Sequence, residues 1–163
     1  MKHSLFFMII LLTFSVTAEE YEYDPNADPQ QLLLESVEKA SSENKLILIV
    51  FGSDWCPDCR SFNKKLSIDP LSKTISNNFI VMHVDVGEWD RNIPFTEKFG
   101  KPIGEGIPSI AILGDDQTLY YVAEAGEFAS ARKSKVISIN DWFVSIESKI
   151  RKLIADTDTE ASR

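Results

Sequence analysis

Cys56 and Cys59 are the residues whose type and spacing most clearly indicate chemistry. They are the two cysteines of the chain and lie three positions apart in the segment Trp55-Cys56-Pro57-Asp58-Cys59. A structural disulfide stabilises a protein mainly by closing a long loop, and a bridge at this spacing closes almost none. We therefore expect the pair to exchange disulfides or to bind a metal, rather than to hold the fold together.

The sequence around the cysteines predicts a strand followed by a helix. Residues 45–51 are a continuous apolar run, typical of a strand buried on both faces, and residues 56–66 have helical spacing with Pro57 in the first turn. The start of a helix favours negative charge, so the Cys56 thiol should ionise more readily than a free cysteine. We assign Cys56 as the nucleophile and Cys59, one turn on, as the resolving thiol that attacks the mixed disulfide.

Asp58, between the cysteines, is a candidate for tuning the redox balance. Its negative charge opposes formation of the Cys56 thiolate. A less stable thiolate makes the reduced pair less favoured, which favours a protein that reduces its substrates. The alternative is that Asp58 is solvated and contributes little.

The rest of the pattern predicts an α/β domain with one mixed sheet. Alternating strands and helices, followed by a hairpin, indicate a parallel strand pair extended by antiparallel strands, with helices on both faces. The further strands are expected at residues 79–86, 109–113 and 118–123. The other helices are expected at residues 29–41 after a capping Asp28, at 69–78 as a short helix or turn, at 94–99 as a possible short helix, and from a capping Asn140 to about residue 155.

These motifs resemble those of the thioredoxin superfamily. The likeness covers roughly residues 45–128 and depends on the Trp-Cys-Pro-Asp-Cys centre after a buried strand, with Gly106-Ile107-Pro108 before another strand. It implies a thioredoxin fold, with Pro108 in the cis form beside the two sulfurs. It also implies that the Ile107 backbone and Trp55 contact an incoming peptide, which pairs as an extra strand. The closest likeness is to exported thioredoxin-like proteins and to reducing domains of periplasmic interchange proteins.

The chain departs from that family at the group expected beneath Cys59. Thioredoxins carry a buried Asp there with a Lys partner, and the corresponding positions are Val50 and, by counting, about Val81. Both charged groups are absent. Deprotonation of Cys59 must therefore rely on water, on the substrate or on another group.

The first residues have the pattern of a secretory signal. Residues 1–18 combine a short positive start, an apolar run at 5–16 and a small-residue exit ending at Ala18. A membrane span needs about 20 apolar residues, so we expect no stable membrane anchor. Residues 19–163 should then form a single domain, with its core at about 28–155, in the periplasm or outside the cell.

Charge and composition narrow the function. The formal net charge of −8 argues against nucleic acid as a partner. We expect a thiol–disulfide oxidoreductase that acts on exported proteins and needs no cofactor beyond the Cys56–Cys59 disulfide. It should receive electrons from a membrane donor, because an oxidising exterior supplies none. The alternative is a non-catalytic binding module or a copper carrier that uses the soft thiolates. We expect no structural metal site, since two cysteines and His83 give too few ligands.

Overall fold

The computed structural model describes residues 22–161. The predicted signal at residues 1–18 and its cleavage point lie outside the described residues. No helix within the described part of the chain is both long and apolar enough to cross a membrane.

The core is a four-stranded mixed sheet in the order β2-β1-β3-β4. β1 runs parallel to β2 and antiparallel to β3, and β3 is antiparallel to β4. Every residue of the two central strands, β1 and β3, is buried, as their continuous apolar runs predict. The predicted mixed sheet is confirmed. The strands are β1 (Leu46–Gly52), β2 (Phe79–Asp85), β3 (Ser109–Leu113) and β4 (Leu119–Val122).

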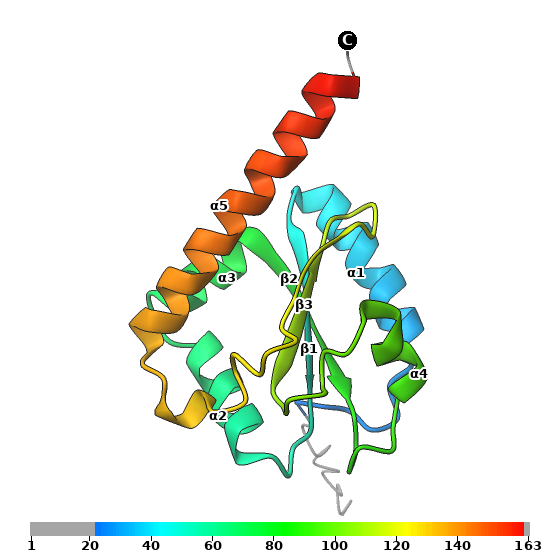
Figure 1. Cartoon of the computed structure of the whole chain (residues 1–163), viewed down its shortest axis with the longest axis vertical. Coiled ribbons are helices and arrows are strands. Elements are labelled where there is room, and N and C mark those ends of the chain that lie inside the picture. The colour runs from blue at the N-terminus through cyan, green and yellow to red at the C-terminus, as the bar shows by residue number, and fades with distance from the viewer. Residues whose placement is uncertain (1–21, 162–163) are drawn as a thin grey trace, which may run out of the picture.

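Helices cover both faces of this sheet, which Figure 1 shows nearly edge-on. α1 and α4 lie on one side, while α2, α3 and α5 lie on the other. The α-helices are α1 (Pro29–Glu43), α2 (Pro57–Leu66), α3 (Leu71–Asn78), α4 (Ile93–Thr96) and α5 (Val136–Ala161), with 3-10 turns η1 (Glu97–Phe99) and η2 (Ala131–Lys133). This is the thioredoxin fold that the motifs predict.

α1 begins and ends where its sequence specifies. The Asp28 side chain caps it by accepting the Gln30 backbone N–H at 2.9 Å, and Pro29 occupies the first turn. Asn44 ends the helix in the left-handed conformation, with φ of 52°. The chain then enters β1 directly, so these local signals fix the start of the strand that leads to the cysteines.

The last helix differs from the prediction at both ends. α5 begins at Val136, so Asn140 lies inside it rather than capping it, and it continues past residue 155 to Ala161. Asn140 is buried, and its Oδ1 accepts a 2.7 Å hydrogen bond from Thr74 Oγ1 on α3. This tertiary contact engages the side chain that would otherwise compete for the local backbone.

Candidate active site

The active-site turn connects β1 to α2. Cys56 is the N-cap of α2: its backbone is extended, and its sulfur accepts the Cys59 backbone N–H at 3.2 Å. Pro57 occupies the first turn, where its missing N–H costs nothing. The structure thus places the Cys56 sulfur at the positive end of a helix, as the sequence predicts.

The pKa values of the two thiols are shifted in opposite directions. The pKa of Cys56 is lowered to about 6, first by the hydrogen bond from the Cys59 thiol and then, against the effect of burial, by backbone N–H groups of Cys59 and Asp58. The same hydrogen bond to Cys56, together with burial, raises the pKa of Cys59. Both cysteines are free, with Cys56 5% and Cys59 0% exposed. Cys56 is therefore suited to initial attack, and Cys59 stays protonated until later.

The loop before β3 meets the cysteines. The Ile107–Pro108 peptide bond is cis, as the resemblance implies. The Ile107 carbonyl oxygen lies 3.6 Å from the Cys56 sulfur. Gly126 packs against this loop with φ of +70°, and a Cβ there would lie 3.2 Å from the Glu105 carbonyl oxygen. The structure therefore brings together Cys56, Ile107 and Pro108, which are far apart in the sequence.

Asp58 is held by an ion pair with Arg132 on η2. Its Oδ2 lies 3.0 Å from Arg132 Nε, and its Oδ1 accepts the Arg132 backbone N–H at 2.9 Å. Desolvation acts to raise the pKa of Asp58, but the hydrogen bonds and charge of Arg132 lower it overall. The charge of the Asp58 carboxylate acts to raise the pKa of Cys56, but its effect is smaller than those of the hydrogen bonds and of burial.

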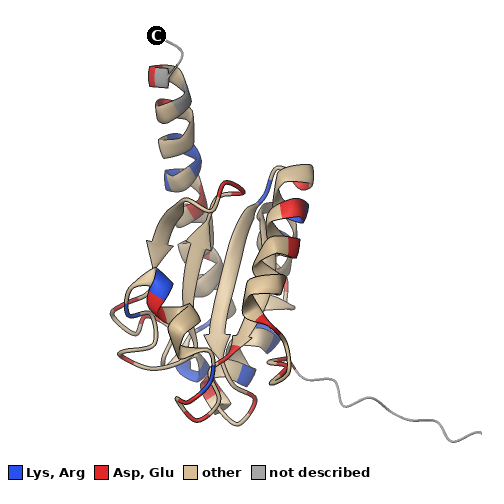
Figure 2. Ribbon diagram, turned by 90° about the vertical axis from the view of Figure 1, so that its right-hand side faces the viewer, with Lys and Arg blue, Asp and Glu red and all other residues tan. Residues whose placement is uncertain are grey.

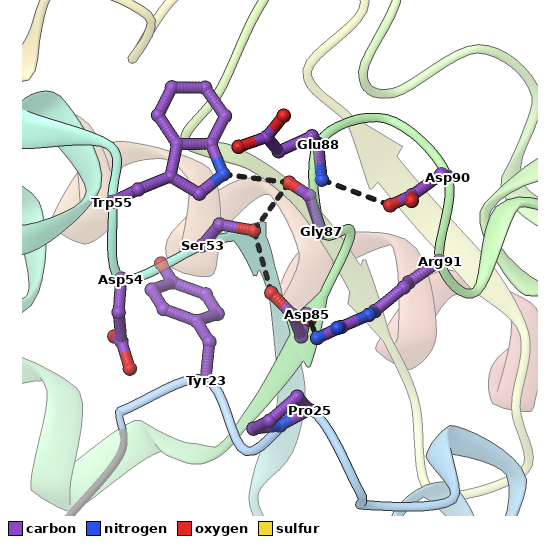
Figure 3. A pocket seen from close by; sticks show the side chains of 10 residues that line it. All are labelled: Tyr23, Pro25, Ser53, Asp54, Trp55, Asp85, Gly87, Glu88, Asp90 and Arg91. Atoms are coloured by element: carbon purple, nitrogen blue, oxygen red, sulfur yellow. Dashed lines mark hydrogen bonds and ion pairs between the residues drawn. The ribbon is translucent and has the colours of Figure 1, made fainter.

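Trp55 lies at the edge of a pocket of about 400 Å³ beside the active-site turn (Figure 3). Its side chain is 49% exposed, and its indole N–H donates to the Gly87 carbonyl at 2.8 Å. The Ser53 hydroxyl donates to Asp85 at 2.6 Å and contacts the same Gly87 oxygen at 2.9 Å. The Gly87 loop therefore holds Trp55 in a fixed orientation next to Cys56.

The pocket has an acidic lining that the sequence analysis missed. Carboxylates of Asp54, Asp85, Glu88 and Asp90 line it, together with Arg91, whose Nη1 lies 3.0 Å from Asp85 Oδ2. In Figure 2, acidic and basic residues mark the loops at the lower end of the ribbon, where β1 and β2 finish in Figure 1. The sequence could have indicated this lining, because adjacent parallel strands end at the same edge of a sheet and the residues that follow them meet there.

The group beside Val50 also differs from the prediction. In the parallel register Val50 pairs with His83, whereas Val81 pairs with Leu48. His83 Nε2 contacts Asn63 Oδ1 on α2 at 3.2 Å, and its ring packs edge-on against Tyr23 with centroids 5.1 Å apart. A polar cluster therefore lies next to the site where the family has its charged pair.

A cysteine pair at the start of a helix, beside a cis-proline loop on a thioredoxin fold, defines a thiol–disulfide centre of the thioredoxin class. The model of the family described as thioredoxin-like matches residues 28–114, which is more than half of the chain. The chain belongs to this family.

Solved structures agree with this assignment. A disulphide isomerase from Xylella fastidiosa Temecula1 is 34% identical with a TM-score of 0.75, covering 79% of this chain and 98% of that one. The C-terminal domain of DsbD from Neisseria meningitidis, in its oxidised form, is 18% identical with a TM-score of 0.50, covering 73% of this chain and 96% of that one. The second likeness concerns the fold alone.

Curated relatives are much longer proteins. "Probable nucleoredoxin 3" from Oryza sativa subsp. japonica is 30% identical over 98 residues, or 47% of this chain and 20% of that protein. The thiol:disulfide interchange protein DsbD from Colwellia psychrerythraea is 22% identical over 116 residues, or 71% and 18%. The chain thus spans about a fifth of the length of these relatives. Family, fold and cysteine pair together support thiol–disulfide oxidoreductase activity as the general class.

Proposed function

We propose that this protein exchanges disulfides with exported protein substrates in the reducing direction, with Cys56 as nucleophile and Cys59 as resolving thiol. The observation that carries this proposal is the Cys56 sulfur, which caps α2 and has a pKa of about 6. At neutral pH such a thiol is largely thiolate, the species that attacks a disulfide.

The reaction takes place in two exchanges. The Cys56 thiolate attacks one sulfur of the substrate disulfide, that S–S bond breaks, and the second substrate sulfur leaves as a thiolate. Cys59 then loses its proton and attacks Cys56, which releases the first substrate sulfur and leaves a Cys56–Cys59 disulfide. The substrate gains two electrons and two protons, and the dithiol loses them. No cofactor beyond this disulfide is needed.

The substrate would lie across the cis-proline loop. The Ile107 carbonyl already lies 3.6 Å from the Cys56 sulfur, so an extended peptide pairing with the Ile107 backbone would bring its cysteine to the nucleophile. Pro108 shapes that loop, and the half-exposed Trp55 offers an aromatic surface at its side. These three residues are the proposed peptide-binding surface.

The acidity of Cys56 supports the reducing direction. A pKa of about 6 is nearer to the value of about 7 in thioredoxin than to about 3.5 in the strong oxidant DsbA. The charge of the Asp58 carboxylate slightly raises this pKa, which also favours the reducing direction. A reductant in the periplasm or outside the cell, where the predicted signal would send this chain, must be recharged by a membrane electron donor.

Three measurements test this function. Insulin reduction with dithiothreitol should proceed above background, Cys59→Ser should trap mixed disulfides through Cys56, and glutathione equilibrium should give a potential near thioredoxin. Absence of both turnover and trapped species would leave the binding module, and Cu(I) titration would then test the carrier. A potential near that of DsbA would overturn the direction alone.

A further inference from the structure

One buried amide in the redox centre lacks a partner. Among residues 22–161, Asn63 Nδ2 is the single buried side-chain nitrogen or oxygen without a hydrogen bond. Asn63 is 5% exposed, so water does not readily replace the missing acceptor. A buried donor without an acceptor is destabilising, and such a group in a reactive centre calls for a functional explanation.

The other end of this amide is firmly held. Asn63 Oδ1 lies 3.2 Å from His83 Nε2 and 3.4 Å from the Tyr23 hydroxyl, which donates to it. Burial lowers the pKa of His83 to about 4, so at neutral pH the ring is uncharged and can offer its Nε2–H to the amide oxygen. In the tautomer with the proton on Nε2, His83 donates to the amide oxygen, as Tyr23 does, and this orientation leaves both Nδ2 hydrogens available.

Tyr23 enters the cluster from the segment before α1. Its side chain is 2% exposed and fills the space that a side chain at position 52 would occupy, since a Cβ on Gly52 would lie 2.5 Å from the tyrosine oxygen. Figure 3 shows its ring below Ser53, close to the active-site turn. Its 3.4 Å bond to Asn63 is long, so little is lost if the hydroxyl turns to a stronger acceptor.

The cluster lies beneath Cys59. Asn63 is four residues after Cys59 on α2, and both are buried, so the two side chains are neighbours on one helix face. His83 pairs in register with Val50, the position where the family has its buried carboxylate. The nearby cysteine charge also contributes, after burial, to raising the pKa of Tyr23, so the phenol keeps its proton and remains a donor.

We propose that Tyr23 Oη and Asn63 Nδ2 are the donors that stabilise the Cys59 thiolate during the resolving step, with His83 as the positioning residue for the amide. The inference rests on the proposed function and deepens it. In the dithiol, Cys59 keeps its proton and Asn63 Nδ2 lacks an acceptor. Once Cys56 is bound to substrate, an ionised Cys59 supplies that acceptor.

The resolving step needs no further reactant. Cys59 releases its proton and its sulfur attacks Cys56, forming the Cys56–Cys59 bond. The bond from Cys56 to the substrate breaks, and the substrate sulfur leaves with the electron pair and takes up a proton. Uncharged donors thus do the work for which related proteins use a buried carboxylate, by stabilising the ion rather than accepting its proton.

Stopped-flow kinetics with a chromogenic aromatic disulfide separates the two exchanges. The first release of coloured thiolate reports attack by Cys56, and the second reports resolution by Cys59. For Tyr23→Phe and Asn63→Leu we expect the second phase to slow about tenfold at pH 7 and its pH profile to move up by about one unit, with the first phase unchanged. The titratable or charged groups that bear on this profile are Cys56, Asp58, Tyr23, His83, Asp54, Arg60, Arg132 and Lys133.

Tyr121→Phe is the matched control. The Tyr121 hydroxyl is also bonded, to Glu127 at 2.7 Å, and its pKa is also raised by burial, but it contacts neither cysteine. It should leave both phases unchanged. Wild-type rates and pH profiles in both cluster variants would overturn the inference, as would equal slowing of both phases. A wild-type protein that shows no second phase would overturn the proposed function as well.

Discussion

The carboxylate of Asp58 and the guanidinium of Arg132 form an ion pair across 74 positions of sequence, with Oδ2 3.0 Å from Nε. The pair joins the first turn of α2 to η2 and places a positive charge next to the negative group that opposes the Cys56 thiolate. The influence of Asp58 on Cys56 therefore depends on Arg132.

Arg132→Gln should raise the pKa of Cys56, because Asp58 would then repel the thiolate without compensation. We expect a rise of a few tenths of a unit, since the Arg132 side chain is 59% exposed and water screens the charge. The rate of Cys56 alkylation against pH at low salt measures it. Asp58→Asn should shift the curve the other way, and identical curves for all three proteins would show that this carboxylate does not act on Cys56.

Cys59→Ala should raise the pKa of Cys56 more strongly, by about one unit or more, because the Cys59 thiol is the main group that lowers it. Wild-type alkylation should increase from about pH 5 and level off above about pH 7, as the thiolate forms around pH 6. The variant curve should lie at higher pH. Cys59→Ser keeps a donor and should shift less, so equal shifts in the two variants would contradict the hydrogen bond as the cause.

Local features of this fold could be predicted from sequence. Buried strands were visible as apolar runs, and the start of α2 was visible in the short motif at Cys56, because both depend on residues close in the chain. The cis form of Pro108 was implied by the family resemblance of its motif. Asn140 has a typical capping side chain, but it lies inside α5, where it accepts a hydrogen bond from Thr74 on α3.

The parts that sequence did not reveal depend on long-range contacts. Counting residues placed the family's lysine partner of Val50 at about Val81, whereas the parallel register pairs Val50 with His83, two residues further on. Val81 and His83 are two positions apart on β2, so they lie on the same face of the sheet. The prediction therefore had the correct face but the wrong residue. Tyr23 belongs to a segment without periodicity, and its burial depends on distant residues: the space left by Gly52, the ring of His83 and the amide of Asn63.

His83→Gln should reduce the loss of folding stability at acid pH. The His83 pKa falls from 6.5 in the open chain to about 4 in the fold. Its contribution to stability is therefore fully present above pH 6.5 and is lost as the pH falls toward 4, by up to about 3 kcal/mol. Urea unfolding at pH 7 and pH 4.5 measures the difference. Equal acid losses in the wild type and the variant would show that His83 protonates freely in the folded protein.

Gly52→Ala should destabilise the protein by about 1–3 kcal/mol, because the added Cβ would lie 2.5 Å from the Tyr23 ring. In a Tyr23→Ala background the same change should cost less, since the space is then free. Gly104→Ala is a control, as its Cβ would come no closer than 3.4 Å to the Lys101 oxygen. A cost that is the same with and without Tyr23 would place the strain elsewhere.

Trp55→Ala should lower kcat/KM for protein disulfides about tenfold and leave the reaction with a small disulfide unchanged. The indole is 49% exposed yet fixed by its 2.8 Å bond to Gly87, so it can contact a peptide with little further ordering. Insulin reduction compared with a small aromatic disulfide separates the two effects. Trp55→Phe keeps an aromatic ring without that bond and should fall between, while Leu153→Ala, at a 55% exposed site on α5, should match the wild type. Equal losses on both substrates would mean that Trp55 acts on Cys56 itself rather than on peptide binding.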